Sequence, residues 1–316
     1  MRPRAAAVVF GVLIAFVIVA PYLAPYDAGR QFPGYQYAPP MRPHLVDELG
    51  RWHAPFAYAV RVVDPIERRY EDDRTRIVQG FRDSLPWFLL GSDSLGRDVL
   101  SRVLIGARLS LGLALLATLL ALSIGAVVGA TAGYAGGWID NALMRVADLV
   151  LVLPGIYIVL ALRGTLPLVL TTTEVFTALV GVLALVGWPS AARGVRGIVV
   201  IEARAEYAEA AHALGASPWR VIARHLLPAT RGFLVVQATL LVPAFIMAEA
   251  TLSFVGLGFA APTPSWGAML TDAAAVQIAA DAPWLLAPAA AIVLTVLAVH
   301  VATAGLDTVL YRRDTT

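Results

Sequence analysis

The sequence predicts an all-α polytopic membrane protein with six transmembrane helices. Hydrophobic residues make up 59% of the 316 residues and charged residues only 15%, whereas a soluble domain is close to a quarter charged. The mean hydropathy is +0.72. So apolar a chain needs lipid rather than water around much of its length.

Six apolar runs have close to the roughly 20 residues that a bilayer-spanning helix needs. They are Ala5–Leu23, Leu109–Ala132, Val146–Leu162, Val175–Ala192, Phe233–Phe254 and Trp284–Leu306. The first follows Arg2 and Arg4, as in a signal peptide, but no clear small-residue cleavage site comes after it. We therefore expect it to remain as the first span.

The arginines predict the orientation. All 24 basic residues are Arg, and short loops rich in Arg stay in the cytoplasm. The short segments on the side of the N-terminus hold 11 of them: Arg2, Arg4, Arg145, Arg193, Arg196, Arg204, Arg220, Arg224, Arg231, Arg312 and Arg313. Those on the other side hold Arg163 alone. Both termini are therefore predicted to be cytoplasmic.

The chain divides into three predicted parts. Residues 1–26 form the first span, residues 27–108 an extracytoplasmic segment, and residues 109–316 a bundle of five further spans. The extracytoplasmic segment holds 12 Arg and 11 acidic residues, so it is nearly neutral. Aromatic and β-branched residues predict strands at Phe56–Val63 and Thr75–Val78, and hence a small folded cap.

Several chemistries are excluded by composition. Without Cys the chain has no disulfide and no thiolate site. Without Lys it lacks the P-loop residue that reaches nucleotide phosphates, so any P-loop ATP hydrolysis belongs to a partner. The five His are scattered and predict no metal centre, and we expect no cofactor. A net charge of +2 does not indicate nucleic-acid binding.

The longest predicted cytoplasmic segment, residues 193–232, has the pattern of a helix–turn–helix. Its first half, from Glu206, is rich in Ala and Glu, and Gly215 can end that helix in a left-handed conformation. Ser217 suits an N-cap and Pro218 the first helical position. The second helix would carry Trp219, Ile222 and Leu226 on one face, and Pro228 would mark the turn into the fifth span.

The first of these two helices carries four alanines: Ala208, Ala210, Ala211 and Ala213. Such small side chains let another protein surface approach the helix closely. They also suit a helix that packs on its own bundle, so both interpretations stay open.

Two parts of this loop resemble the EAA motif of ABC importer permeases. They are Glu209-Ala210-Ala211, with Gly215 after three more residues, and Leu227-Pro228. His225 stands where the motif usually has Ile, as in the peptide-importer branch of the family. Three further segments are similar to the same family: Leu90–Leu111, Gly133–Arg145 and Leu252–Gly267. Over about residues 86–310 the chain resembles the second permease subunit of dipeptide, oligopeptide and nickel importers.

The resemblance implies a type I ABC importer permease fold in the cytoplasmic (inner) membrane of a bacterium or archaeon. The chain would form half of a translocation pathway with a homologous permease subunit. Two cytoplasmic ATPases would hydrolyse ATP, and an extracytoplasmic solute-binding protein would deliver the solute. The loop would be a coupling helix that fits a cleft on the ATPase. The residues implicated in this coupling are Glu209, Ala210, Ala211, Gly215, Leu227 and Pro228.

An ion-coupled secondary transporter is the alternative. It would need ionisable residues at membrane depth on several helices, and the candidates are Glu249 and His300, with Asp148 near an edge. Glu249 itself supports two interpretations: a gate or helix contact on the pathway, or a carboxylate paired inside the bundle. An intramembrane enzyme is not indicated, since no HExxH or Gly-x-Ser-x-Gly motif is present.

The sequence leaves the solute open. Residues 27–85 and 255–283 are expected to meet the binding protein, which largely selects the solute. The resemblance favours peptides, with nickel, sugars and other small solutes as alternatives.

Overall fold

The structure, a computed structural model, describes residues 4–47, 50–64, 69–81, 85–152, 157, 161, 164–165 and 170–313. The chain forms two compact units. The first unit comprises Met1–Leu13, Leu111–Glu249 and Thr295–Thr316, and the second comprises Ile14–Ser110 and Ala250–Leu294.

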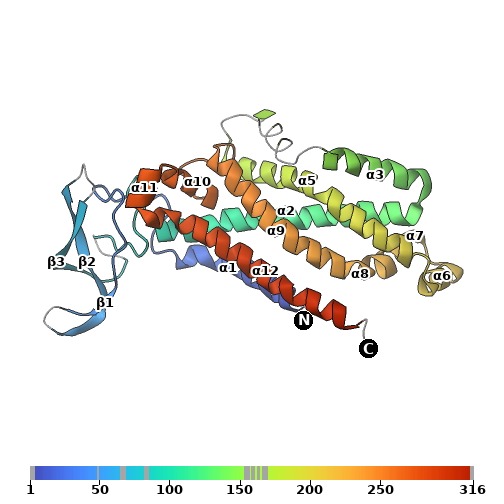
Figure 1. Cartoon of the computed structure of the whole chain (residues 1–316), viewed down its shortest axis with the longest axis horizontal. Coiled ribbons are helices and arrows are strands. Elements are labelled where there is room, and N and C mark those ends of the chain that lie inside the picture. Colours follow the sequence, from blue (N-terminus) through green and yellow to red (C-terminus); the bar gives the residue numbers. More distant parts are fainter. Residues whose placement is uncertain are drawn as a thin grey trace. The chain divides into compact units, whose positions relative to one another are not determined.

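Helices dominate the described chain (Figure 1). They are α1 (Arg4–Leu23), α2 (Val99–Ala135), α3 (Gly137–Val152), α5 (Thr172–Glu202), α6 (Glu206–Ala213), α7 (Pro218–Val221), the π-helix η1 (Ile222–Leu226), α8 (Leu227–Ala229), α9 (Arg231–Phe254), α10 (Trp266–Leu270), the 3-10 helix η2 (Thr271–Ala273), α11 (Val276–Asp281), the 3-10 helix η3 (Pro283–Leu286) and α12 (Ala287–Arg313). The strands are β1 (His44–Val46), β2 (Trp52–Asp64) and β3 (Arg69–Val78).

Four helical stretches of the described chain are long and apolar enough to cross a membrane. They are Val99–Ala135, Thr172–Glu202, Arg231–Phe254 and Pro283–Val301, and they match the predicted second, fourth, fifth and sixth spans. A shorter apolar helix, Val8–Leu23, coincides with the predicted first span. The predicted third span, Val146–Leu162, begins inside α3, but most of the rest lies outside the described residues. The polytopic helical class is confirmed, while the count of six spans stays a prediction.

Residues 27–108 contain the only strands of the described chain. β2 pairs antiparallel with both neighbours, in the order β1-β2-β3. The predicted strand Phe56–Val63 lies within β2, and Thr75–Val78 is the end of the longer β3. The apolar part of the fold is therefore all-α, and a small sheet is added in the segment between the first two predicted spans.

Aromatic rings form the core beside this sheet. Phe32 meets Tyr26 with ring centroids 5.1 Å apart, edge to face. It meets Phe88 in the same way at 5.4 Å. The Tyr26 hydroxyl accepts a hydrogen bond from the backbone N–H of Trp87 at 2.8 Å. Edge-to-face pairs of this kind favour one arrangement of the rings, and they give residues 27–108 a core of their own.

A buried network of charges organises the start of α2. Asp93 accepts a hydrogen bond from Nε of Arg97 at 2.7 Å, and Nε of Arg102 lies 3.4 Å from the same oxygen. Asp98 accepts from the backbone N–H of Ser101 at 2.7 Å and so caps α2. Burial is the main reason that the pKa of Asp98 rises to about 6. These side chains hold the segment before α2 in a defined conformation.

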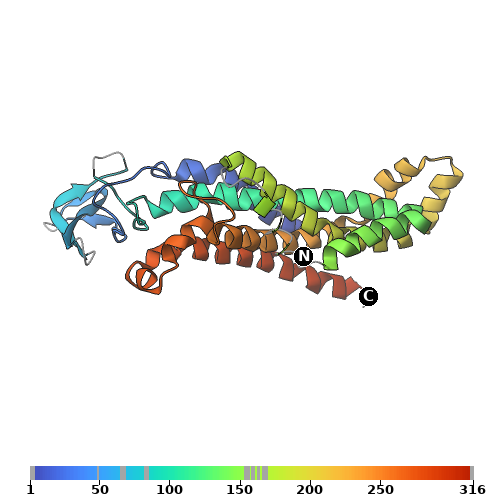
Figure 2. The ribbon, with the colours of Figure 1, turned by 90° about the horizontal axis from the view of Figure 1, so that it is seen from above.

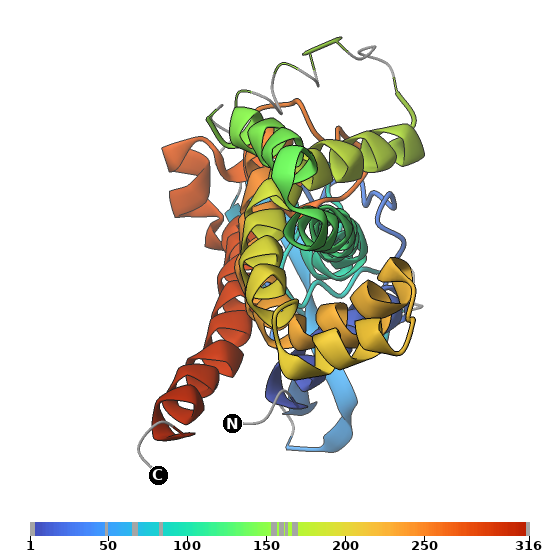
Figure 3. The ribbon, with the colours of Figure 1, turned by 90° about the vertical axis from the view of Figure 1, so that its right-hand side faces the viewer.

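In the first unit, α2 and α5 pack with their backbones in close contact. Gly125, Gly129 and Gly133 form a stripe on α2, and a Cβ added at any of them would collide with α5. At Gly125 the collision would be with Cβ of Ala191 at 2.6 Å and the carbonyl oxygen of Trp188 at 2.9 Å. Figure 3 shows α2 almost end-on, with α3 and α5 beside it. Small residues at four-residue spacing permit this approach.

Candidate functional site

The first part of the segment predicted to be cytoplasmic is helical. α5 continues through Arg193 and Arg196 to Glu202, while the cytoplasmic location of residues 193–232 stays a prediction. Ion pairs with α3 accompany this part of α5. Arg196 donates from Nε to Asp140 at 2.6 Å, and Arg193 pairs with Asp148. The hydrogen bond from Arg196 lowers the pKa of Asp140. Charges that the sequence suggested for a loop instead join two helices.

The residues after α5 form the predicted helix–turn–helix, drawn in yellow to light orange in Figure 2. α6 starts at Glu206, and the hydroxyl of Tyr207 donates a hydrogen bond to Glu202 at the end of α5. That hydrogen bond is the main reason that the pKa of Tyr207 rises to about 12. The contact links the exposed side chains of the first turn of α6 and the last residue of α5.

One side of α6 is seated in the core of the first unit. Ala208 is fully buried, in a cluster with Ala130 of α2 and Val195 and Val199 of α5. Ala211 is partly buried against the same cluster. The interpretation of an Ala-rich helix packed on its own bundle therefore holds for this side of α6.

The other side of α6 is uncovered in this chain. Glu209, Ala210 and Ala213 are exposed, and Leu214, which follows the helix, is 88% exposed. Trp219 at the start of α7 is 66% exposed. We call these five residues the outer face of the hairpin. Large apolar side chains that extend into water beside a carboxylate are typical of a surface that meets another protein.

Gly215 makes the turn as predicted. Its φ is +79°, in the left-handed region that glycine adopts at little cost. Its N–H donates to the carbonyl of His212 at 2.9 Å, and that of Ala216 donates to the carbonyl of Ala211 at 3.0 Å. This pair of bonds is a Schellman motif, which satisfies the last carbonyls of α6. An added Cβ would meet nothing within 4 Å, so the backbone angle, not space, requires glycine.

The second helix buries two of the three residues predicted to share one face. Ser217 takes the N-cap position without a side-chain cap bond, and Pro218 is the first helical residue. The predicted apolar face included Trp219, which is exposed, while Val221, Ile222 and Leu226 are buried. Val221, Ile222 and Leu226 join the cluster that also holds Ala208. The π-helix η1 begins at Ile222, after Trp219.

The predicted site residues therefore lie in three settings. Glu209 and Ala210 are on the outer face, Ala211 and Leu227 pack toward the core cluster, and Gly215 forms the turn. Pro228 lies in α8, immediately before α9. Glu249 lies apart from them on α9 and is fully buried within the span Arg231–Phe254.

One contact of α6 has no counterpart in the sequence analysis. Tyr134, in the last turn of α2, places its hydroxyl 3.0 Å from Nε2 of His212, in the last turn of α6. The two rings are stacked with centroids 5.8 Å apart. The residues are 78 positions apart, so no local pattern could have joined them.

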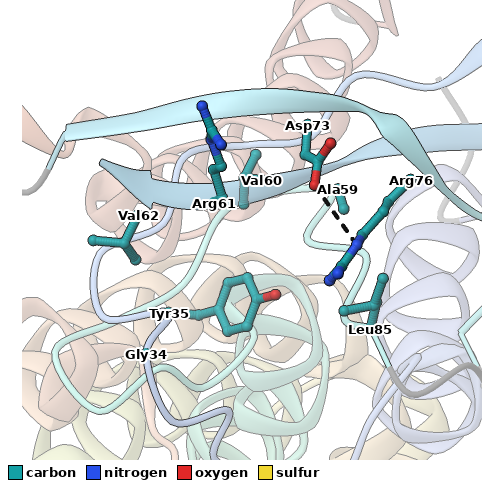
Figure 4. Close-up of a pocket in the computed structure, with 9 residues that line it drawn as sticks. All are labelled: Gly34, Tyr35, Ala59, Val60, Arg61, Val62, Asp73, Arg76 and Leu85. Atoms are coloured by element: carbon teal, nitrogen blue, oxygen red, sulfur yellow. Dashed lines mark ion pairs between the residues drawn. The ribbon is translucent and has the colours of Figure 1, made fainter. Parts of the chain in front are cut away.

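A recess in the second unit is a separate feature. It has a volume of about 230 Å³ and lies against β2 and β3 (Figure 4). Tyr35 and Arg76 face it, and Nε of Arg76 lies 3.7 Å from a carboxylate oxygen of Asp73. The hydroxyl of Thr75 chiefly lowers the pKa of Asp73, whereas burial raises that of Tyr35. The described residues contain no cluster of three or more potential metal ligands.

Comparison with known proteins gives the class. The family described as binding-protein-dependent transport system inner membrane components matches residues 125–314. The N-terminal transmembrane domain of oligopeptide transport permease C matches residues 4–40. This chain belongs to the first family: it is a permease subunit of an ABC importer, a multi-pass protein of the inner membrane that works with ATPase and binding-protein components.

Its relatives include glutathione transport system permease proteins named GsiD. That of Shigella flexneri serotype 5b is 41% identical over 220 residues, which cover 70% of each chain. Those of Escherichia coli O157:H7 and Shigella boydii serotype 4 are 39% identical over the same share of each chain.

Proposed function

We propose that this subunit couples ATP hydrolysis by its partner ATPases to solute transport through the outer face of the α6 hairpin. One observation supports this above all. Glu209 and Ala210 are exposed on a helix whose opposite side is anchored by the buried Ala208. A helix uncovered on one side and seated on the other can receive a partner and pass its displacement to the bundle.

The proposal includes an orientation and an assembly. Both termini and the hairpin face the cytoplasm, and residues 27–108 face outside, as the arginine distribution indicates. The chain forms half of the pathway with a homologous permease subunit, above two ATPases. It hydrolyses no ATP itself, because it has no Lys for a P-loop.

The proposed solute is a small peptide or a similar compound. The relatives carry names that refer to glutathione transport, and glutathione is a tripeptide. A binding protein would present the solute at the sheet-bearing segment. Titration of that purified binding protein with glutathione and with unmodified di- and tripeptides, by calorimetry, tests the solute class.

The coupling proposal is tested with single cysteines, since the chain has none of its own. Ala210→Cys on the outer face carries a maleimide photo-crosslinker in the assembled transporter. Thr131→Cys, exposed on α2, is the matched control. We expect light to join the ATPase to position 210 and not to position 131. Equal labelling at both, or none at 210, would contradict the proposal.

A second measurement separates this mechanism from ion-coupled transport. In proteoliposomes that contain the complete transporter, uptake should require ATP and proceed without any ion gradient. Uptake driven by a proton or sodium gradient in the absence of ATP would favour the secondary transporter.

A further inference from the structure

The hydrogen-bonded stack of Tyr134 and His212 connects the outer hairpin to the long helix α2. The hydroxyl of Tyr134 lies 3.0 Å from Nε2 of His212, and the ring planes are inclined by 21°. The bond can run in either direction, because Nε2 accepts the hydroxyl proton in one tautomer and donates in the other. The contact thus combines a directional bond with ring stacking.

The contact that α6 makes through Ala208 differs in kind from the Tyr134–His212 pair. Ala208 meets Ala130, Val195 and Val199 through methyl groups. Such apolar contacts resist compression strongly, but each atom pair adds little attraction when two surfaces are drawn apart. A hydrogen bond also resists separation. The pair Tyr134–His212 therefore suits a movement in which α6 pulls on α2, while Ala208 suits one in which it pushes.

A displacement of the end of α2 would reach two further helices, α5 and α3. The glycine stripe joins α2 to α5 by close backbone contact. Arg196 on α5 in turn is hydrogen-bonded to Asp140 on α3. Packed elements of this density move together rather than deform one by one. Displacement of α2 would therefore carry α5 and α3 with it.

We propose that Tyr134 and His212 are positioning residues for transport, and that their contact transmits displacement of α6 to α2. This inference rests on the proposed function, because it takes α6 as the helix to which the ATPase docks. It adds the pair of side chains through which the movement leaves that helix.

The test uses the complete transporter reconstituted with its ATPases and binding protein. Tyr134→Phe keeps the ring and removes the hydroxyl. Tyr207→Phe is the control, because it removes the same group from α6 but breaks a contact with Glu202 rather than with α2. The readout is the number of solute molecules transported per ATP hydrolysed.

We expect Tyr134→Phe to lower this ratio about 2- to 10-fold, the factor that one side-chain hydrogen bond contributes. Co-purification of the ATPases should not change, because the outer face is untouched. His212→Ala should lower the ratio similarly. His212→Gln, which keeps a donor and an acceptor, should recover part of it, and Tyr207→Phe should leave it unchanged.

Three results would overturn the inference: an unchanged ratio in both Tyr134→Phe and His212→Ala, no recovery in His212→Gln, or an equal fall in Tyr207→Phe. If Tyr134→Phe lowered the yield of protein, the two His212 variants would decide. Failure of the proposed function looks different, because position 210 would then not crosslink to the ATPase. Crosslinking with an unchanged ratio would leave the docking proposal standing and remove only this one.

Discussion

Replacing Gly125 with Val should separate α2 from α5. The new Cβ would lie 2.6 Å from Cβ of Ala191 and 2.9 Å from the carbonyl oxygen of Trp188. Carbon atoms pack at about 3.5–4.0 Å, so the helices must move apart by about 1 Å or bend. Overpacking of this kind costs about 1–3 kcal/mol. Valine recovers only a few tenths of a kcal/mol in helix propensity over glycine.

Gly181→Val on α5 is the matched control, because a Cβ there meets nothing within 4 Å. Both variants change helix propensity in the same way, so the difference between their Tm values reports the collision alone. A difference of about 1–3 kcal/mol corresponds to a Tm lower by about 2–12 °C for Gly125→Val. The measurement is thermal unfolding of the purified transporter in detergent. Equal Tm values for the two variants would show that α2 and α5 do not pack through this stripe.

Three further predictions follow from the hairpin and the charged network. Gly215→Val forces a β-branched residue to positive φ. We expect this variant and Glu209→Arg to insert into the membrane normally, to abolish uptake and to weaken co-purification of the ATPases. Normal uptake by both variants would show that the hairpin does not take part in coupling. Ser217→Cys should react with an impermeant thiol reagent only when membranes are opened, so labelling in sealed cells would reverse the orientation. The pKa of Asp98 is raised on folding from 3.8 to about 6, so the folded state binds this proton more tightly than the unfolded state. The free energy of unfolding therefore falls by roughly 3 kcal/mol as the pH rises between those two values. Asp98→Asn, which can still cap α2, should flatten thermal stability measured between pH 4 and pH 7, and an unchanged slope would assign that dependence to other groups.

The hairpin was predictable because its signals are local. Gly215, Ser217 and Pro218 are adjacent, and each favours one backbone conformation at its own position. Helical spacing placed Trp219 on one face with Ile222 and Leu226, and of these only Ile222 and Leu226 are buried. Which side of a short helix is covered depends on residues from distant parts of the sequence, here Ala130 and Val195.

The longer α5 and the link to α2 needed three-dimensional information. Arg193 and Arg196 were counted as loop charges, yet they are satisfied by Asp148 and Asp140 from a separate helix. Tyr134 and His212 belong to different predicted segments, so neither suggested the other. The sequence alone could suggest α6 as the proposed docking helix but not the side chains that join it to the bundle.

The exposed tip of the hairpin has a consequence for the life of the subunit before assembly. Leu214 and Trp219 present apolar surface to water as long as no partner covers them. Chaperones and quality-control proteases act on proteins that expose apolar surface. Under the coupling proposal, the ATPase would cover these two side chains in the assembled transporter, whereas a subunit without its partners would leave them exposed. Synthesis of this chain without its ATPases should therefore shorten its lifetime in the membrane, and Leu214→Ser should prolong it.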